Sequence, residues 1–183
     1  MVELRHLPKG RVKEALTFSI KIMDPQIIEQ QDELTETIVQ IKRTSKKTKG
    51  GNRLSFSALA VVGDGAGRVG TSLSKAPSVI EAIKKATLRA KSQLVEVPIV
   101  GDARTIPHEI EVNIGASRVM LKPAPAGTGI RAGGPVRSVL QAAGVQNIVA
   151  KILGTSGKKQ NVDTTIFALT QLKTIKQRIK KHS

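Results

Sequence analysis

The stretch that decides the fold is GGNRLSFSALAVVGDGAGRVGTSLSKA, residues 50–76. From Arg53 to Val62, apolar and polar residues alternate, which predicts a strand. The glycine-rich segment 63–67 predicts a turn, and Arg68–Ser74 predicts the strand that returns. The sequence therefore predicts an antiparallel hairpin in the first half of the chain.

A basic loop leads into this hairpin. Residues 37–44 fit a further strand, and Lys46–Asn52 form the predicted loop, in which Gly50 and Gly51 supply the positive φ that a tight turn needs. The loop and its flanks hold no acid and carry Lys42, Arg43, Lys46, Lys47, Lys49 and Arg53. A strand pair with a cationic tip suits contact along a polyanion, and none of its side chains can perform covalent chemistry. Binding is therefore favoured over catalysis.

The charge of the whole chain points the same way. The formal charge is +16, from 30 basic and 14 acidic residues, which exceeds the needs of solubility and indicates a nucleic-acid partner. Residues 112–183 hold one acid, Asp163, against twelve Lys and Arg. Residues 24–36 hold five acids and no base, so we expect that segment not to contact the polyanion.

Several classes of protein are excluded by composition. The chain has no Cys, no Trp and no Tyr, and only three Phe. Disulfides and thiolate metal sites are thus excluded, and base stacking on aromatic side chains is disfavoured. The three histidines have no neighbour at metal-ligand spacing. No apolar run approaches a membrane span and no signal-peptide centre is present, so the expected location is the cytoplasm.

Helices and strands are predicted along the rest of the chain. Ser78 and Glu81 form a candidate capping box. The helix that follows has an apolar stripe of Val79, Ile80, Ile83, Ala86, Ala90 and Leu94, and its opposite face carries Lys85, Arg89 and Ser92, either in solvent or on RNA.

The second half alternates in the same way. Segments 109–114 and 118–122 predict a hairpin, Pro135 and Gly144 bracket a short helix, and 147–153 predict a buried strand. Asp163 is the predicted cap of a last helix, with a stripe of Ile166, Leu169, Leu172, Ile175 and Ile179.

Two glycine-rich motifs have competing interpretations. Gly65-x-Gly67-x-x-Gly70 matches the dinucleotide pattern, but a strand follows it instead of a helix, so a hairpin turn with Asp64 as a turn residue is favoured. No loop ends in Gly-Lys-Ser/Thr, so we expect no cofactor and no nucleotide hydrolysis. Segment 127–137 precedes a helix, and its amides could bind an anion beside Arg131 and Arg137. A tight turn packed against a neighbour explains that segment equally well.

The residues also resemble a known family. Gly50–Ala76 followed by Ala82–Ala86 resembles the signature of bacterial-type small-subunit ribosomal protein number five. Gly127–Gly134 with the segment 139–151 resembles the second-half signature of the same family. Two long motifs in the expected order identify the chain as a member.

This resemblance implies an α+β fold in two domains. It implies a double-stranded-RNA-binding-like domain of three strands plus a helix (33–97) and a βαβ-containing ribosomal domain (104–175). From the residues themselves we expect an extension (1–32), a linker (98–103) and a basic tail (176–183) around these domains. The resemblance also implies binding to small-subunit ribosomal RNA, a place on the mRNA entry side, contacts with ribosomal proteins numbers four and eight, and a role in decoding accuracy. The location that it implies is the ribosome in the cytoplasm, with an organellar ribosome as the alternative. The alternative function is a free-standing double-stranded-RNA-binding regulator.

Two sets of site residues follow from these considerations. The expected RNA-binding residues are Arg43, Ser45, Lys46, Lys47, Lys49, Gly50, Gly51, Arg53, Arg68, Lys75 and Lys122. The contact with protein number four is expected at Gly127, Gly129, Arg131 and Arg137. We expect no catalytic and no metal-ligating residue.

Overall fold

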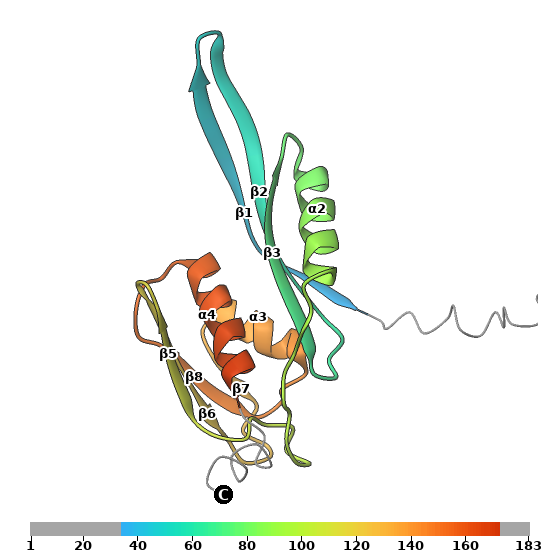
Figure 1. Cartoon of the computed structure of the whole chain (residues 1–183), viewed down its shortest axis with the longest axis vertical. Helices are drawn as coiled ribbons and strands as arrows, with labels where there is room; N and C mark the ends of the chain where they lie inside the picture. The colour runs from blue at the N-terminus through green and yellow to red at the C-terminus, as the bar shows by residue number, and fades with distance from the viewer. Residues whose placement is uncertain (1–33, 173–183) are drawn as a thin grey trace, which may run out of the picture. The chain divides into compact units, whose positions relative to one another are not determined.

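The computed structural model describes residues 34–172, in which two four-stranded sheets are combined with three helices (Figure 1). The first sheet consists of β1 (Thr35–Thr48), β2 (Gly51–Gly63), β3 (Arg68–Ala76) and the short β4 (Val95–Glu96), in that order and antiparallel throughout. Helix α2 (Val79–Lys91) packs on one face of this sheet. The predicted three strands plus a helix are confirmed, and β4 adds a strand that the sequence did not indicate.

The second half of strand β2, from Ser57 to Gly63, is buried on both faces. Ala58 and Ala60 pack against Ala82 and Ala86 of α2, whereas Leu59 on the other face belongs to the main core. Successive side chains in this part of β2 thus point alternately toward α2 and toward the main core, and both surroundings are apolar.

The predicted details of α2 are partly wrong. Ile80 of the predicted stripe is 65% exposed, while Ala82 is fully buried. Alanines on the sheet allow a close approach only to small helix residues, so the larger side chain lies outside the contact. Ser78 is the N-cap residue, but its side chain makes no capping hydrogen bond, so the predicted capping box is absent.

The second sheet contains a βαβ unit. Its strands are β5 (Ile110–Ile114), β6 (Ser117–Pro123), β7 (Ile130–Arg131) and β8 (Ile148–Ile152), in the order β5-β6-β8-β7. Strands β7 and β8 are parallel, and α3 (Gly134–Ala143) connects them. The structure contains the predicted hairpin of segments 109–114 and 118–122 and the predicted helix between Pro135 and Gly144. It also contains the strand predicted at 147–153.

The last helix, α4 (Lys158–Gln171), begins earlier than expected. Its N-cap is Gly157, and Asp163 lies in its second turn, 2.7 Å from the ammonium group of Lys159. The prediction that Asp163 caps this helix is therefore wrong. Leu169 and Leu172 of the predicted stripe are buried, and Ile175 and Ile179 lie outside the described residues.

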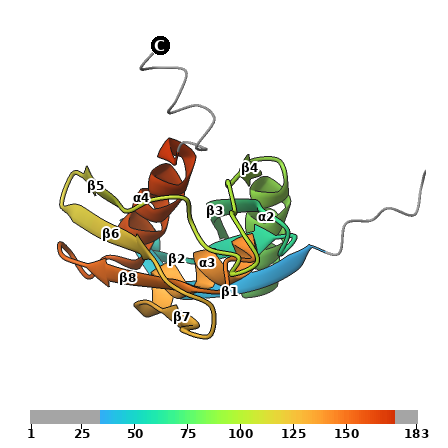
Figure 2. The same ribbon diagram turned by 90° about the horizontal axis from the view of Figure 1, so that it is seen from below.

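The two sheets share one hydrophobic core. Helices α3 and α4 lie between the sheets (Figure 2). Leu59 and Val69 of the first sheet belong to the same buried cluster as Leu140 of α3. A side chain at Gly63 or Gly144 would overlap backbone atoms of the opposing segment, so the turn after β2 and the end of α3 meet through glycine.

The expected linker makes ordered contacts. Val100 forms an antiparallel bridge with Thr105, and the carbonyl of Ala103 accepts from Nδ2 of Asn147 over 2.6 Å. The expected extension (1–32) and basic tail (176–183) lie outside the described residues.

Candidate nucleic-acid interface

Strands β1 and β2 continue well beyond the rest of their sheet (Figure 1). β3 ends at Ala76, which lies opposite Phe56 of β2. Residues 43–55, which we call the arm, therefore form a two-stranded hairpin. This length of pairing follows from the unbroken register between Gln40–Thr48 and Gly51–Leu59.

The turn of the arm is shorter than predicted. Thr48 pairs with Gly51, so Lys49 and Gly50 are the two turn residues. Lys46 and Lys47, predicted to lie in a loop, are strand residues. The positive φ is at Gly51, at +126°, and not at Gly50.

The arm carries uncompensated positive charge. Residues 37–63 contain no acid, and their six cations are all exposed: Lys42, Arg43, Lys46, Lys47, Lys49 and Arg53. None of the six forms an ion pair within residues 34–172. Unpaired cations this close together create a positive potential that attracts a polyanion.

The predicted RNA-binding residues do not all lie together. Lys75 is exposed on β3 at the base of the arm, where it pairs with Ser57. Arg68 is at the opposite end of β3, and Lys122 is on β6 in the second sheet, 3.3 Å from a carboxylate oxygen of Glu109. The structure thus groups nine of the eleven predicted residues at the arm and its base.

Arg68 has a structural role in the turn before β3. Its Nε atom lies 2.7 Å from Oδ2 of Asp64, whose side chain is only 7% exposed. Burial would raise the pKa of Asp64, but hydrogen bonds from the Arg68 side chain and from the N–H groups of Arg68 and Ala66 outweigh it and hold the pKa below 3.8. This is the turn role expected for Asp64.

The glycine-rich segment before α3 is stabilised by local contacts. The N–H of Gly129 donates to Oδ1 of Asn147 over 3.0 Å, and Arg137 donates to the carbonyl of Ile130 over 2.9 Å. Gly129 has φ +71° and open space around it, so backbone conformation and not close packing requires glycine there. Gly127, Gly129, Arg131 and Arg137 are all exposed.

One structural contact between distant segments, made by Arg104, was not indicated by any sequence motif. Arg104 donates from its guanidinium to the carbonyl of Gly65, and its own carbonyl accepts from the N–H of Gln146 over 2.9 Å. Its φ of +45° makes it the one non-glycine residue with positive φ in the described part of the chain. Arg104 therefore connects the turn after β2 with the segment after α3.

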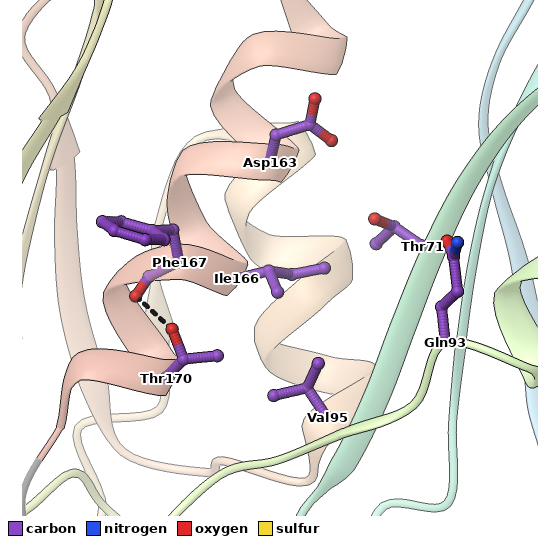
Figure 3. A pocket seen from close by; sticks show the side chains of 7 residues that line it. All are labelled: Thr71, Gln93, Val95, Asp163, Ile166, Phe167 and Thr170. Carbon is purple, nitrogen blue, oxygen red and sulfur yellow. Dashed lines mark hydrogen bonds between the residues drawn. The ribbon is translucent and has the colours of Figure 1, made fainter.

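A pocket of about 350 Å³ lies between β3, β4 and α4 (Figure 3). It is lined by Thr71, Gln93, Val95, Asp163, Ile166, Phe167 and Thr170. The Thr170 hydroxyl donates to the carbonyl of Phe167 over 2.7 Å, and Asp163 is the one carboxylate in the lining. This set contains neither a nucleophile paired with a base nor a pair of carboxylates.

Residues 34–172 show neither a candidate metal site nor a candidate membrane-spanning helix. Within this range, no three His, Cys, Asp or Glu side chains are grouped so that they could hold a metal ion. No helix in the same range is long and apolar enough to span a membrane.

Fold and surface together define an α+β protein of the polyanion-binding class. Residues 34–98 match the family "Ribosomal protein S5, N-terminal domain", and residues 112–182 match "Ribosomal protein S5, C-terminal domain". A relative from Syntrophobacter fumaroxidans, named small ribosomal subunit protein uS5, is 48% identical over 143 residues, which cover 78% of this chain and 85% of the relative. The chain belongs to the ribosomal protein S5 family.

This membership fixes the general role. The family is a structural component of the small ribosomal subunit and not an enzyme, so the chain is an RNA-binding protein of the translation machinery with ribosomal RNA and ribosomal proteins as partners. The expectation of a ribosomal role without catalysis is confirmed.

Proposed function

We propose that this protein binds small-subunit ribosomal RNA through the arm, near the mRNA entry side, and supports assembly and translational accuracy. The observation that carries the proposal is the group of six exposed cations, none of them ion-paired within residues 34–172, on and beside a hairpin that contains no acid. Lys and Arg are the side chains that contact phosphate most often, and the sequence offers no Tyr or Trp on which bases could stack, so phosphate contact is the mode that we propose. Family membership supplies the ribosomal context and disfavours the free-standing regulator.

Salt dependence of RNA binding tests this proposal. The triple substitution Lys46→Ala, Lys47→Ala, Lys49→Ala removes three exposed arm cations. Each lost phosphate contact reduces the slope of log K against log[salt] by up to about 0.9 on duplex-like RNA. We therefore expect a flatter slope in fluorescence anisotropy with a small-subunit RNA fragment.

A matched control variant removes the same number of positive charges as the arm triple variant. Lys91, Arg118 and Lys159 are each ion-paired with a carboxylate, so replacing these three with Ala removes the same charge from other surfaces. The control is expected to retain the wild-type slope. An unchanged slope in the arm triple, or equal losses in both triples, contradicts a specific role of the arm.

We further propose that the surface of Gly127, Gly129, Arg131 and Arg137 contacts ribosomal protein number four, and that protein number eight is a second neighbour. The exposure of all four residues around β7 supports the first contact. Gly129→Arg and Arg137→Leu should alter misreading in reconstituted subunits, because they change a contact that restrains the subunit and leave RNA binding intact. Thermal melting of the isolated variants serves as the control, and wild-type misreading in normally assembled subunits would reject this contact.

A further inference from the structure

The register between β1 and β2 sorts the cations of the arm and its base onto two faces. Residues directly opposite each other in an antiparallel pair point to the same face. Lys46 is opposite Arg53, and Lys42 is opposite Ser57, which is in turn opposite Lys75 of β3. Four cations therefore share one face, although β1, β2 and β3 contribute them separately.

This face, which we call the polar face, has no apolar side chain between Lys42 and the tip. Its members are Lys42, Thr44, Lys46, Thr48, Arg53, Ser55, Ser57 and Lys75. Ser57 is followed on the same face by Leu59, which is buried in the main core. The polar face thus begins where the core ends and continues to the end of the arm.

The opposite face has another character. It is the face on which α2 packs, because Ala58 and Ala60 on this side contact the helix. Beyond the helix it presents Ile41 and Leu54, which are 45% and 49% exposed. Arg43 and Lys47 alternate with these apolar residues, with Arg43 opposite Phe56.

We infer that the RNA phosphate backbone runs along the polar face and that the α2 face of the arm makes no phosphate contacts. This inference rests on the proposed function and specifies how the arm would perform it. Lys42 becomes a central contact, whereas Arg43, Ser45 and Lys47 leave the set of expected RNA-binding residues. Of the three cations removed in the triple variant, Lys46 lies on the polar face and Lys49 in the turn, so the flatter slope of that variant is attributed to these two and not to Lys47.

The spacing of the charges favours an extended polyanion. Lys42 and Lys46 are four residues apart on one strand, which is about 13 Å, and Lys42 and Lys75 are two strands apart, which is about 10 Å. These are backbone spacings, and a row of cations repeated at such intervals matches the regular spacing of charges along a polynucleotide better than the single charge of an isolated phosphate. A chain of phosphates can contact all of them.

The chemistry of the polar face also separates RNA from an acidic protein partner. Protein interfaces have a buried core in which apolar and aromatic side chains are concentrated and charged ones depleted. The polar face offers Lys, Arg, Ser and Thr only, so it has nothing from which such a core could be formed. The α2 face, with Ile41 and Leu54, is the one suited to an apolar contact.

Two double substitutions on the same strand test the inference. The first variant, Lys42→Gln with Lys46→Gln, removes two charges from the polar face. The second variant, Arg43→Gln with Lys47→Gln, changes the next residue in the sequence at each position and removes two charges from the α2 face. All four side chains are exposed, so both variants are expected to melt as the wild type does. Binding to a small-subunit RNA fragment is measured over a range of KCl concentrations.

The expected results differ between the two faces. The polar-face variant should lose up to about 1.8 from the slope of log K against log[salt], since each phosphate contact contributes about 0.9. The α2-face variant should keep the wild-type slope. Equal losses in the two variants, or a loss confined to the α2 face, overturn the inference and leave RNA binding by the arm intact. Failure of the wild type to bind the fragment overturns the proposed function itself.

A cross-linking experiment provides a readout that does not change the charge. The chain contains no Cys, so a single introduced thiol is unique. Ser55→Cys places a thiol on the polar face and Ser45→Cys places one on the α2 face, each with a near-isosteric change. After attachment of a photoreactive group, RNA cross-links are expected from position 55. Cross-links of equal or greater yield from position 45 overturn the inference.

Discussion

At the scale of single residues, Asp64 shows how a glycine-rich turn obtains a fixed conformation. Its carboxylate accepts from the N–H of Ala66 at 2.8 Å, from the N–H of Arg68 at 2.9 Å and from the Arg68 guanidinium at 2.7 Å. Three donors on one nearly buried carboxylate order the turn that contacts α3. A sequence pattern similar to a dinucleotide loop is thereby used for chain reversal.

We expect Asp64→Ala to lower the free energy of unfolding by about 1–3 kcal/mol at pH 7, because it leaves backbone donors without an acceptor. The pKa of Asp64 is lowered on folding, so its contribution is present above the unfolded pKa of 3.8 and is lost as the pH falls through the folded value. Urea unfolding of the wild type and of the Asp64→Ala variant between pH 7 and pH 3 measures the difference in their free energies of unfolding. The difference between them should shrink below about pH 4, and a difference that grows on acidification would contradict the role of the carboxylate.

At the scale of elements, α2 illustrates packing between small residues. Ala86 is fully buried and belongs to the cluster formed with Ala58, Ala60 and Ala82. We expect Ala86→Leu to destabilise the protein by about 1–3 kcal/mol, because the helix cannot approach the sheet without strain. Lys84→Leu adds the same side chain on the exposed side of the helix and should change stability by less than about 0.5 kcal/mol. Chemical denaturation of both variants decides whether the close approach is required.

The elements also show which parts of the fold could be predicted from the sequence. Strand β2, the turn after it and the ends of α3 were predicted because periodicity, Asp64, Pro135 and Gly144 act locally. Only the end of the arm, residues 46–52, was predicted as a loop, because strands that bury little core show no separation of apolar from polar residues. The two-residue strand β7 has no periodicity at all and exists through its pairing with β8.

The candidate site was predictable in composition and not in arrangement. The sequence located the cations of the arm, since an acid-free basic segment is visible without a structure. Lys46 and Lys47 lie on opposite faces because neighbouring residues of a strand alternate, but that Lys46 shares its face with Arg53 depends on the register, which one sequence does not specify. Arg104 was missed because its positive φ and its contact with Gly65 arise only when distant segments meet.

At the scale of the whole molecule, the two family domains are joined by a common core. The domain matches end at residue 98 and resume at residue 112, yet Leu59 of β2 and Leu140 of α3 lie in the same buried cluster. The carbonyl of Ala142 accepts from the N–H of Gly65 over 3.0 Å, which adds a polar contact to the joint. Each half would expose part of this core if the other half unfolded. The halves are therefore expected to depend on each other for stability.

This dependence predicts a single cooperative unfolding transition, in which calorimetric and van't Hoff enthalpies agree. Leu59→Ala and Leu140→Ala make the same change in the two halves at positions 2% and 0% exposed. Each is expected to lower the free energy of unfolding by about 2–5 kcal/mol, and each should shift the whole transition, because the cavity forms in a core that both halves share. Leu88→Ala, at a position 68% exposed, is the matched control and should have a small effect. Scanning calorimetry that resolves two transitions, with Leu59→Ala moving one and Leu140→Ala the other, would show that the halves fold independently and that their contact contributes little to stability.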